Sequence, residues 1–161
     1  MGACERILQR DAVSTQTQQE TEERVGRFSV EFEVANSEDM VRARLGLLGP
    51  GEIRRVRLRG IVDPGATRLV LPGSVAERLG LAPTERVKVQ YADGRSDTRD
   101  LIDGVHAEIE GRGRIFSAIV EPARTTARIG AIVLEDLDFL VDCKAQRLVP
   151  RDPEYVVNEI E

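Results

Sequence analysis

Apolar and polar residues alternate between Phe28 and Val34, and again between Arg86 and Tyr91. A period of two places the apolar side chains on one face of a β-strand and the polar side chains on the other. Both segments are therefore predicted to be strands with one solvated face. Shorter apolar runs bounded by turn residues predict further strands at 53–62, 68–71, 105–110, 114–120, 139–142 and 147–149.

Two segments carry the signals of short helices. Ser74 and Glu77 have the spacing of a capping box, and Gly80 suits the left-handed residue that ends a helix, so a helix is expected over Val75–Leu79. A second helix is expected over Ile132–Leu137. The segment Met40–Leu48 fits either a strand or a short helix.

The connections between these elements are short and rich in turn residues. Asp93-Gly94 is the strongest hairpin signal, because both residues tolerate the positive φ that a two-residue turn requires. Eight or nine short strands without an alternation of strands and helices predict a mostly β domain that forms a small closed β-barrel with one or two short helices. Val, with 18 residues more frequent than Leu, Ile or Phe, agrees with a strand-rich core.

The domain is expected to span residues 27–151. The preceding segment, 1–26, includes a stretch from Thr15 to Glu23 without any apolar residue, and is predicted to be a flexible N-terminal tail. At 161 residues the chain has room for one domain.

Charge and residue types exclude several classes of function. A net charge of −5, an aromatic content of 4% and the absence of Trp make nucleic acid an unlikely partner. No apolar run reaches the roughly 18 residues of a membrane span. One His and no Cys-x-x-Cys leave no metal site, and no cofactor motif is present. Two cysteines without a paired context suit a reducing, cytoplasmic location.

The candidate for chemistry is Asp63, which follows the apolar pair Ile61-Val62 and precedes Pro64-Gly65-Ala66-Thr67. A carboxylate at the end of a core strand is costly unless it is hydrogen-bonded or shares a proton, and Gly65 could supply an N–H. Asp-Pro-Gly is equally a common β-turn. The local pattern leaves both interpretations open.

The order of motifs resembles that of the retropepsin-like aspartic proteases, in particular the small single-domain bacterial type. The motif at Asp63 is followed by an apolar strand that ends in Leu-Pro, a helix that ends in Leu-Gly-Leu, a hairpin, and an apolar-Gly element before a helix. The corresponding segments are 62–67, 69–72, 79–81, 91–95, 129–135 and 141–150.

This resemblance implies an aspartic endopeptidase. Asp63 would be catalytic, and because the chain holds one such motif, a homodimer would bring two Asp63 carboxylates together to share one proton and activate a water. Gly65, Ala66 and Thr67 would support the pair. Further implied elements are a substrate-binding flap at Tyr91, Ala92, Asp93 and Gly94, a hydrophobic-Gly element at Ile129 and Gly130, a peptide or protein substrate in extended conformation, and a C-terminal tail, 152–161, that could add a dimer-interface strand.

Pro64 departs from the family pattern, which has Ser or Thr at this position. Proline has no hydroxyl and no N–H, and so lacks hydrogen bonds that would join the two chains beside the Asp63 pair. The alternative function is therefore a catalytically weak or inactive dimer that binds peptides or proteins. The basic strand Arg54–Arg59 is interpreted as a solvated face that balances nearby acids.

Overall fold

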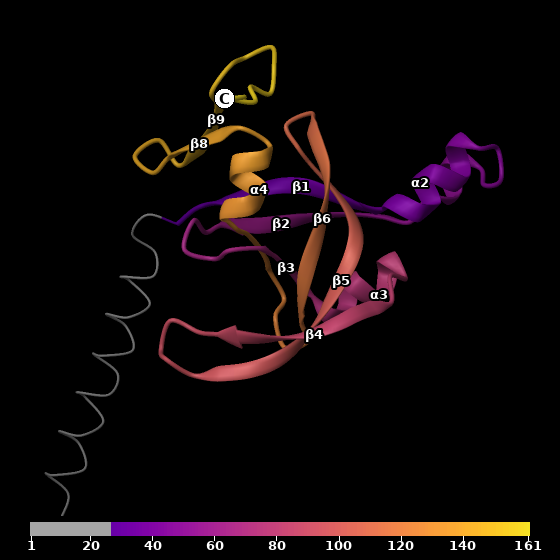
Figure 1. The fold of residues 1–161 in the computed structure, drawn as a ribbon, viewed down its shortest axis with the longest axis horizontal. Coiled ribbons are helices and arrows are strands. Elements are labelled where there is room, and N and C mark those ends of the chain that lie inside the picture. Colours follow the sequence, from indigo (N-terminus) through magenta and orange to yellow (C-terminus); the bar gives the residue numbers. More distant parts are fainter. Residues whose placement is uncertain (1–26) are drawn as a thin grey trace, which may run out of the picture.

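The computed structural model describes residues 27–161, so the tail predicted for 1–26 lies outside the described residues. The order of elements in Figure 1 is β1 (Ser29–Asn36), α2 (Ser37–Arg44), a 3₁₀ turn η1 (Pro50–Glu52), β2 (Arg55–Val62), β3 (Leu69–Pro72), α3 (Gly73–Leu79), β4 (Pro83–Gln90), β5 (Ser96–Ile109), β6 (Arg112–Glu121), β7 (Ala127–Ile129), α4 (Ala131–Asp136), β8 (Phe139–Asp142) and β9 (Arg147–Pro150).

Six strands close into a barrel. Their order is β1-β2-β7-β3-β6-β5, and β1 pairs with β5 to complete the ring. The predicted mostly β, closed-barrel fold is therefore confirmed. The core consists of the inward-facing apolar side chains of these strands together with those of α3 and α4, the largest fully buried ones being Leu69, Leu71, Leu79, Ile102, Ile109, Ile129 and Leu137. Within residues 27–161, no helix is long and apolar enough to cross a membrane.

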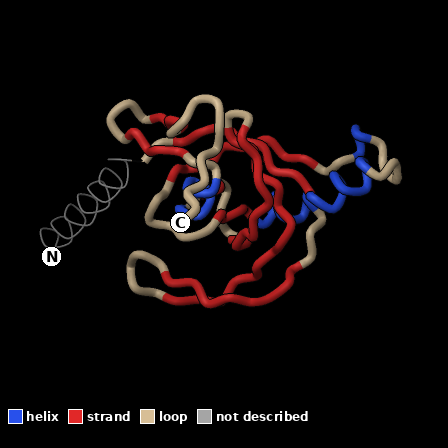
Figure 2. The backbone as a smooth tube through the Cα atoms, turned by 45° about the horizontal axis from the view of Figure 1, so that its top comes forward, coloured by secondary structure: helices blue, strands red, loops and turns tan. Residues whose placement is uncertain are grey.

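The β4–β5 hairpin extends away from the ring, as Figure 2 shows. Strand β5 is longer than predicted, because the polar segment Ser96–Asp100 pairs with β4 and only from Leu101 onward does β5 also pair with β6. Beyond Gly104, with φ at 79°, β5 exchanges β4 for β1 as its second partner. The polar composition of Ser96–Asp100 concealed the strand, since neither of its faces is fully buried.

The turns differ from those expected. At Asp93-Gly94 only Gly94 has positive φ, and a three-residue loop with a type I turn results, in which the Gly94 N–H donates to the carbonyl of Tyr91 at 2.9 Å. The two-residue turn with positive φ at both positions is Glu110-Gly111. In α3 the predicted capping box is wrong, because the helix begins two residues earlier than expected, at Gly73, with Pro72 as its N-cap. Gly80 ends α3 in the left-handed conformation, as predicted.

The first part of the ambiguous segment, 40–44, belongs to a helix, α2, whereas 45–48 is a turn, and a buried polar cluster explains the helix. The Asn36 side chain accepts hydrogen bonds from the N–H groups of Glu38 and Asp39 and donates to the carbonyl of Leu79 at 2.8 Å. Asp39, 3% exposed, accepts from the Arg54 backbone N–H and from both sides of the Arg54 guanidinium, at 2.7–3.1 Å. These bonds hold α2 on the barrel by way of α3 and the start of β2.

Asp39 makes the stability of the barrel depend on pH. The Arg54 side-chain hydrogen bonds lower the pKa of Asp39 from 3.8 to about 2, against the opposing effect of burial. A lowered folded-state pKa contributes stability above the unfolded-state value, and that contribution is lost as the pH falls from about 4 toward 2. In urea unfolding we expect Asp39→Asn to be less stable than the wild type at pH 6, and the difference to shrink toward pH 2. A difference that stays constant over this range would contradict the role of Asp39.

Candidate active site

Asp63 lies directly after β2, at the edge of the barrel. Strand β2 runs parallel to β7, with Val62 beside Ile129, and the Asp63 N–H donates to the Ile129 carbonyl at 3.0 Å. Asp63 is 7% exposed. Two segments far apart in the sequence therefore meet at this carboxylate.

The loop after Asp63 is held on both sides. The Gly65 N–H donates to Asp63 Oδ1 at 3.2 Å, and the Ala66 N–H donates to the Asp63 carbonyl at 3.0 Å, which closes a turn. The carbonyls of Ala66 and Thr67 accept from the N–H groups of Ala131 and Ile132, at 2.8 and 3.0 Å. The first residues of α4 thus fix the backbone that carries the carboxylate. Asp-Pro-Gly is a turn, and the same turn orients Asp63, so the two interpretations of the local pattern are compatible.

Gly130 is required by a close backbone approach. A Cβ at this position would lie 2.3 Å from the Arg68 carbonyl oxygen and 2.8 Å from that of Ala66. Both distances are far below van der Waals contact and involve backbone atoms that cannot rotate away. Glycine therefore lets the β7–α4 junction sit against the loop that follows Asp63.

Two arginines, which sequence reasoning missed, face the carboxylate. Arg128 Nη1 donates to Asp63 Oδ2 at 2.5 Å, and Arg27 Nη2 lies 3.9 Å from the same oxygen. The Arg128 side chain is 17% exposed. The sequence did contain a signal for Arg128. Side chains alternate between the two faces of a strand, and Ala127 and Ile129 point into the core, so Arg128 points away from it.

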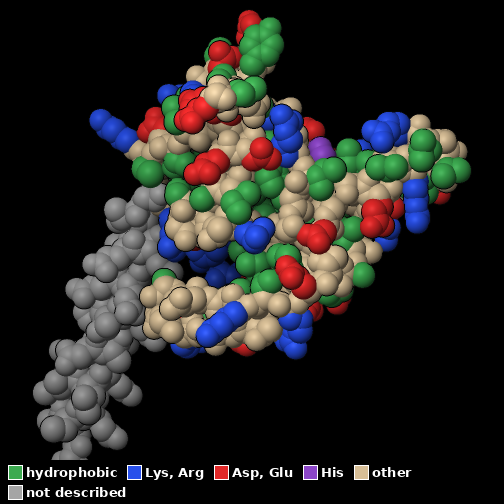
Figure 3. Space-filling view, viewed as in Figure 1, with side chains coloured by type: hydrophobic (Ala, Val, Ile, Leu, Met, Phe, Trp, Pro, Cys, Tyr) green, Lys and Arg blue, Asp and Glu red, His purple; other side chains and the backbone are tan. Residues whose placement is uncertain are grey.

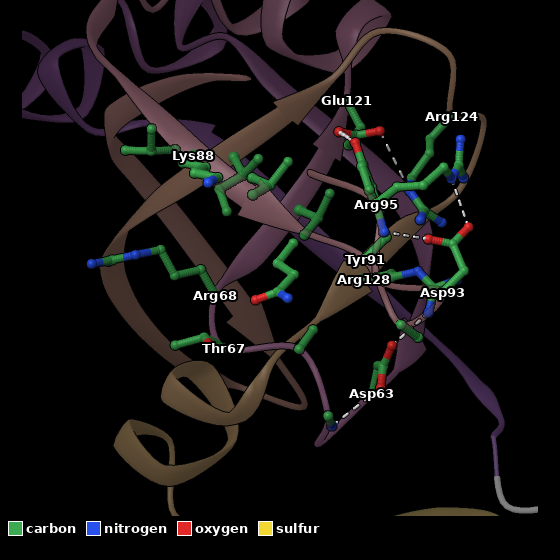
Figure 4. A pocket seen from close by; sticks show the side chains of 18 of the residues that line it. Asp63, Thr67, Arg68, Lys88, Tyr91, Asp93, Arg95, Glu121, Arg124 and Arg128 are labelled. Atoms are coloured by element: carbon green, nitrogen blue, oxygen red, sulfur yellow. Dashed lines mark hydrogen bonds and ion pairs between the residues drawn. The ribbon is translucent and has the colours of Figure 1, made fainter. Parts of the chain in front are cut away.

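A cleft of about 720 Å³ opens between the 63–68 loop and the β4–β5 hairpin. In Figure 3 it is a hollow with basic side chains inside it, and Figure 4 shows the lining residues from close by. Of the predicted site residues, the cleft is lined by Asp63, Gly65, Ala66, Thr67, Tyr91, Ala92 and Asp93. Gly94 is at the exposed hairpin tip, Pro64 is exposed on the loop, and Ile129 and Gly130 are buried behind it. The predicted flap and the predicted catalytic loop therefore face one another across a single cleft.

Glu121 connects the hairpin to the barrel, and it too was missed. This 8% exposed carboxylate accepts from the Tyr91 hydroxyl at 2.7 Å and from Arg99 Nε at 2.5 Å. Burial, with a further contribution from the hydrogen bond to Glu121, raises the pKa of Tyr91, so the hydroxyl remains a donor at neutral pH. The Arg95 guanidinium lies 5.5 Å from the centre of the Tyr91 ring. No local pattern marks Glu121, because its partners are 22 and 30 residues away.

Comparison with known proteins gives one family and a set of solved structures. The model of the family described as aspartyl protease matches residues 49–111, which include Asp63 and the β4–β5 hairpin. One similar solved structure is the solution structure of simian foamy virus (mac) protease, with 15% sequence identity and a TM-score of 0.44; the match covers 66% of this chain and 91% of that one. No curated protein matches the chain.

The close approach at Gly130 can be tested by adding one methyl group. We expect Gly130→Ala to lower the free energy of unfolding by about 1–3 kcal/mol, the usual cost of overpacking, because backbone atoms must move. Gly51→Ala is the matched control, since a Cβ at Gly51 meets no atom within 4 Å. Urea unfolding of both variants measures the difference. Equal stability of the two variants would show that the junction is not tightly packed.

Proposed function

We propose that the protein is a homodimeric aspartic endopeptidase, because the aspartyl protease family model matches residues 49–111 and the strands of this segment belong to a closed β-barrel and its β4–β5 hairpin. Asp63 would be the catalytic residue of each chain. One observation carries the proposal: Asp63 is buried at the end of a barrel strand, on a loop fixed by α4, and faces a cleft bounded by an edge strand.

The proposed chemistry requires two carboxylates that hold one proton between them. Two carboxylates in direct contact cannot both be ionised, so in the proposed dimer one Asp63 would be ionised and the other protonated. The ionised carboxylate takes a proton from water as the water oxygen attacks the peptide carbonyl, and the protonated one donates its proton to that carbonyl oxygen. Collapse of the resulting diol releases the amine, which takes up a proton. The Gly65 N–H donates to Asp63 Oδ1 and supports the orientation of that carboxylate.

The substrate would bind as an added strand. Strand β4 is paired with β5 alone among the described strands, so its other edge has free N–H and C=O groups. Residues Val87–Gln90 of β4 line the cleft. An extended peptide could therefore hydrogen-bond to β4 with its backbone while passing Asp63.

Dimerisation is proposed because the described chain offers one such motif. Exposed apolar side chains, namely Ile132, Leu140, Tyr155, Val157 and Ile160, are found on α4, β8 and the C-terminal segment. In the single chain, residues 152–161 form no strand. A role of this segment as a dimer-interface strand stays a prediction, as does a cytoplasmic location.

The first test removes the charge of Asp63. We expect Asp63→Asn to lower the rate of peptide-bond cleavage at least about 10²-fold, because an amide cannot take the proton of the water. Cleavage of a denatured protein substrate, followed by mass spectrometry of the products, measures it. Glu108→Gln, an exposed position on β5 outside the cleft, is the control and should cleave like the wild type. Unchanged cleavage by Asp63→Asn would exclude the mechanism.

A second candidate function is a dimer that binds peptides without cleaving them, and two observations favour it. The Arg128 guanidinium already binds Asp63 Oδ2, so a second carboxylate would have to compete with it. Pro64 has no N–H to offer at an interface. Peptide binding that is equal in the wild type and in Asp63→Asn, with no product at any pH from 4 to 8, would support this function.

Arg128 distinguishes the two functions further. The Arg128 guanidinium donates to Asp63 Oδ2 and would compete with the second carboxylate for that oxygen. If the protein is a protease, we expect Arg128→Met to raise kcat on a neutral peptide several-fold. Arg124→Met is the matched control, since Arg124 lines the same cleft but its nearest acidic partner is Glu121, at 3.9 Å. An equal or lower kcat for Arg128→Met than for Arg124→Met would refute this account of the Arg128 contact.

A further inference from the structure

The cleft has the opposite charge to the chain. The whole chain has a net charge of −5, yet the cationic residues that line the cleft outnumber the acidic ones by six to three. The acidic residues are Asp63, Asp93 and Glu121. The cationic ones are Arg27, Arg68, Lys88, Arg95, Arg124 and Arg128.

The excess positive charge is concentrated away from Asp63. Near Asp63, Arg128 is paired with that carboxylate, and Arg95 is paired with Asp93 at 2.7 Å. Arg68 and Lys88 form no ion pair within 4 Å with any residue of 27–161, and in Figure 4 they lie at the other end of the cleft. Arg68 contributes to the low pKa of Asp103, after the larger effect of the Ser117 hydrogen bond, but Asp103 does not line the cleft.

Two buried guanidinium N–H groups of the cleft residues lack a hydrogen-bond acceptor within residues 27–161. Arg124 Nε and Arg128 Nε are buried and have no hydrogen-bond partner among the described residues. An unsatisfied buried donor is destabilising, and both atoms belong to guanidiniums of residues that line the cleft. The walls of the cleft are therefore rich in donors as well as in positive charge.

We propose that the cleft selects acidic peptides, with an Asp or Glu side chain of the ligand paired to Lys88 and Arg68, one or more residues from the bond at Asp63. The proposal rests on the proposed function in that it uses the same cleft and the same β4 edge. The free edge at Val87–Gln90 favours a peptide over a nucleic acid, because that edge pairs with a backbone of alternating N–H and C=O groups. Tyr91, the aromatic residue of the cleft, already has Arg95 stacked on its ring.

The contribution of each charge should be modest and sensitive to salt. Lys88 and Arg68 are exposed, and exposed pairs typically contribute about two- to five-fold in affinity each. Because such pairs are screened within about 10 Å at 0.1 M salt, the preference for an acidic peptide should weaken as ionic strength rises.

The experiment measures binding rather than cleavage. A library of fluorescent short peptides, in which Glu, Gln or Lys is placed at each position in turn, is titrated into the full-length Asp63→Asn protein. We expect Glu to be preferred over Gln at one position, and the preference to fall about two- to five-fold in Lys88→Met and in Arg68→Met. Arg86→Met is the matched control: Arg86 is on β4, faces Asp100 and does not line the cleft, and its loss should leave the preference unchanged. Lys88→Glu should shift the preference toward Lys.

The outcomes separate this proposal from the proposed function. Equal binding of Glu and Gln peptides, or an equal effect of Arg86→Met, would overturn the selection of acidic peptides while leaving proteolysis by the wild type intact. Tighter binding of a single-stranded RNA oligomer than of any Glu peptide would also overturn it. A Glu preference that depends on Lys88, in a protein that cleaves nothing, would support the acidic ligand and would refute the endopeptidase.

Discussion

The parallel pairing of β2 with β7 is the constraint on which the site depends. It places the ends of two strands, about 65 residues apart in the chain, side by side, so that Asp63 and Gly130 meet. The backbone hydrogen bond from Asp63 to Ile129 and those from the start of α4 to the following loop then fix the backbone that carries the carboxylate. Closure of the barrel by β1 and β5 buries the apolar residues beneath this junction. Backbone contacts thus determine where Asp63 lies, and the groups around its side chain determine what the carboxylate can do.

The groups that contact Asp63 favour two different roles for its carboxylate. The loop held by α4 and the N–H of Gly65 suit a carboxylate that must hold one orientation. Arg128 makes Asp63 one partner of an ion pair, an arrangement that in many proteins is purely structural. In the proposed dimer, a second carboxylate would compete with the Arg128 guanidinium for Asp63. The two proposed functions, cleavage and binding alone, differ in the outcome of this competition.

The sequence predicted features with a short-range cause. Alternation revealed most barrel strands, Gly80 marked the end of α3, and the apolar pair before Asp63 placed that residue at a strand end. Prediction from the sequence failed for segments whose structure depends on tertiary contacts. Ser96–Asp100 is a strand only because β4 pairs with it, and α2 is a helix because Asn36 and Asp39 find partners on α3 and β2. Glu121 and Arg99 meet Tyr91 from distant strands, so no local spacing could reveal them, whereas alternation in β7 indicated only that Arg128 points away from the core.

The change of partner within β5 has a mechanical consequence. Residues Ser96–Asp100 are joined to β4 alone, so the outer half of the hairpin is a two-stranded ribbon that extends past the wall of the barrel. An isolated ribbon of this kind is marginally stable, and Glu121 ties it down through Tyr91 and Arg99. The Glu121 carboxylate therefore holds the outer half of the hairpin against the barrel. Releasing its two bonds would leave the ribbon attached to the barrel only through Leu101 and Ile102, where β5 joins β6, so the segment from Asp100 outward could move while the barrel pairs stay intact.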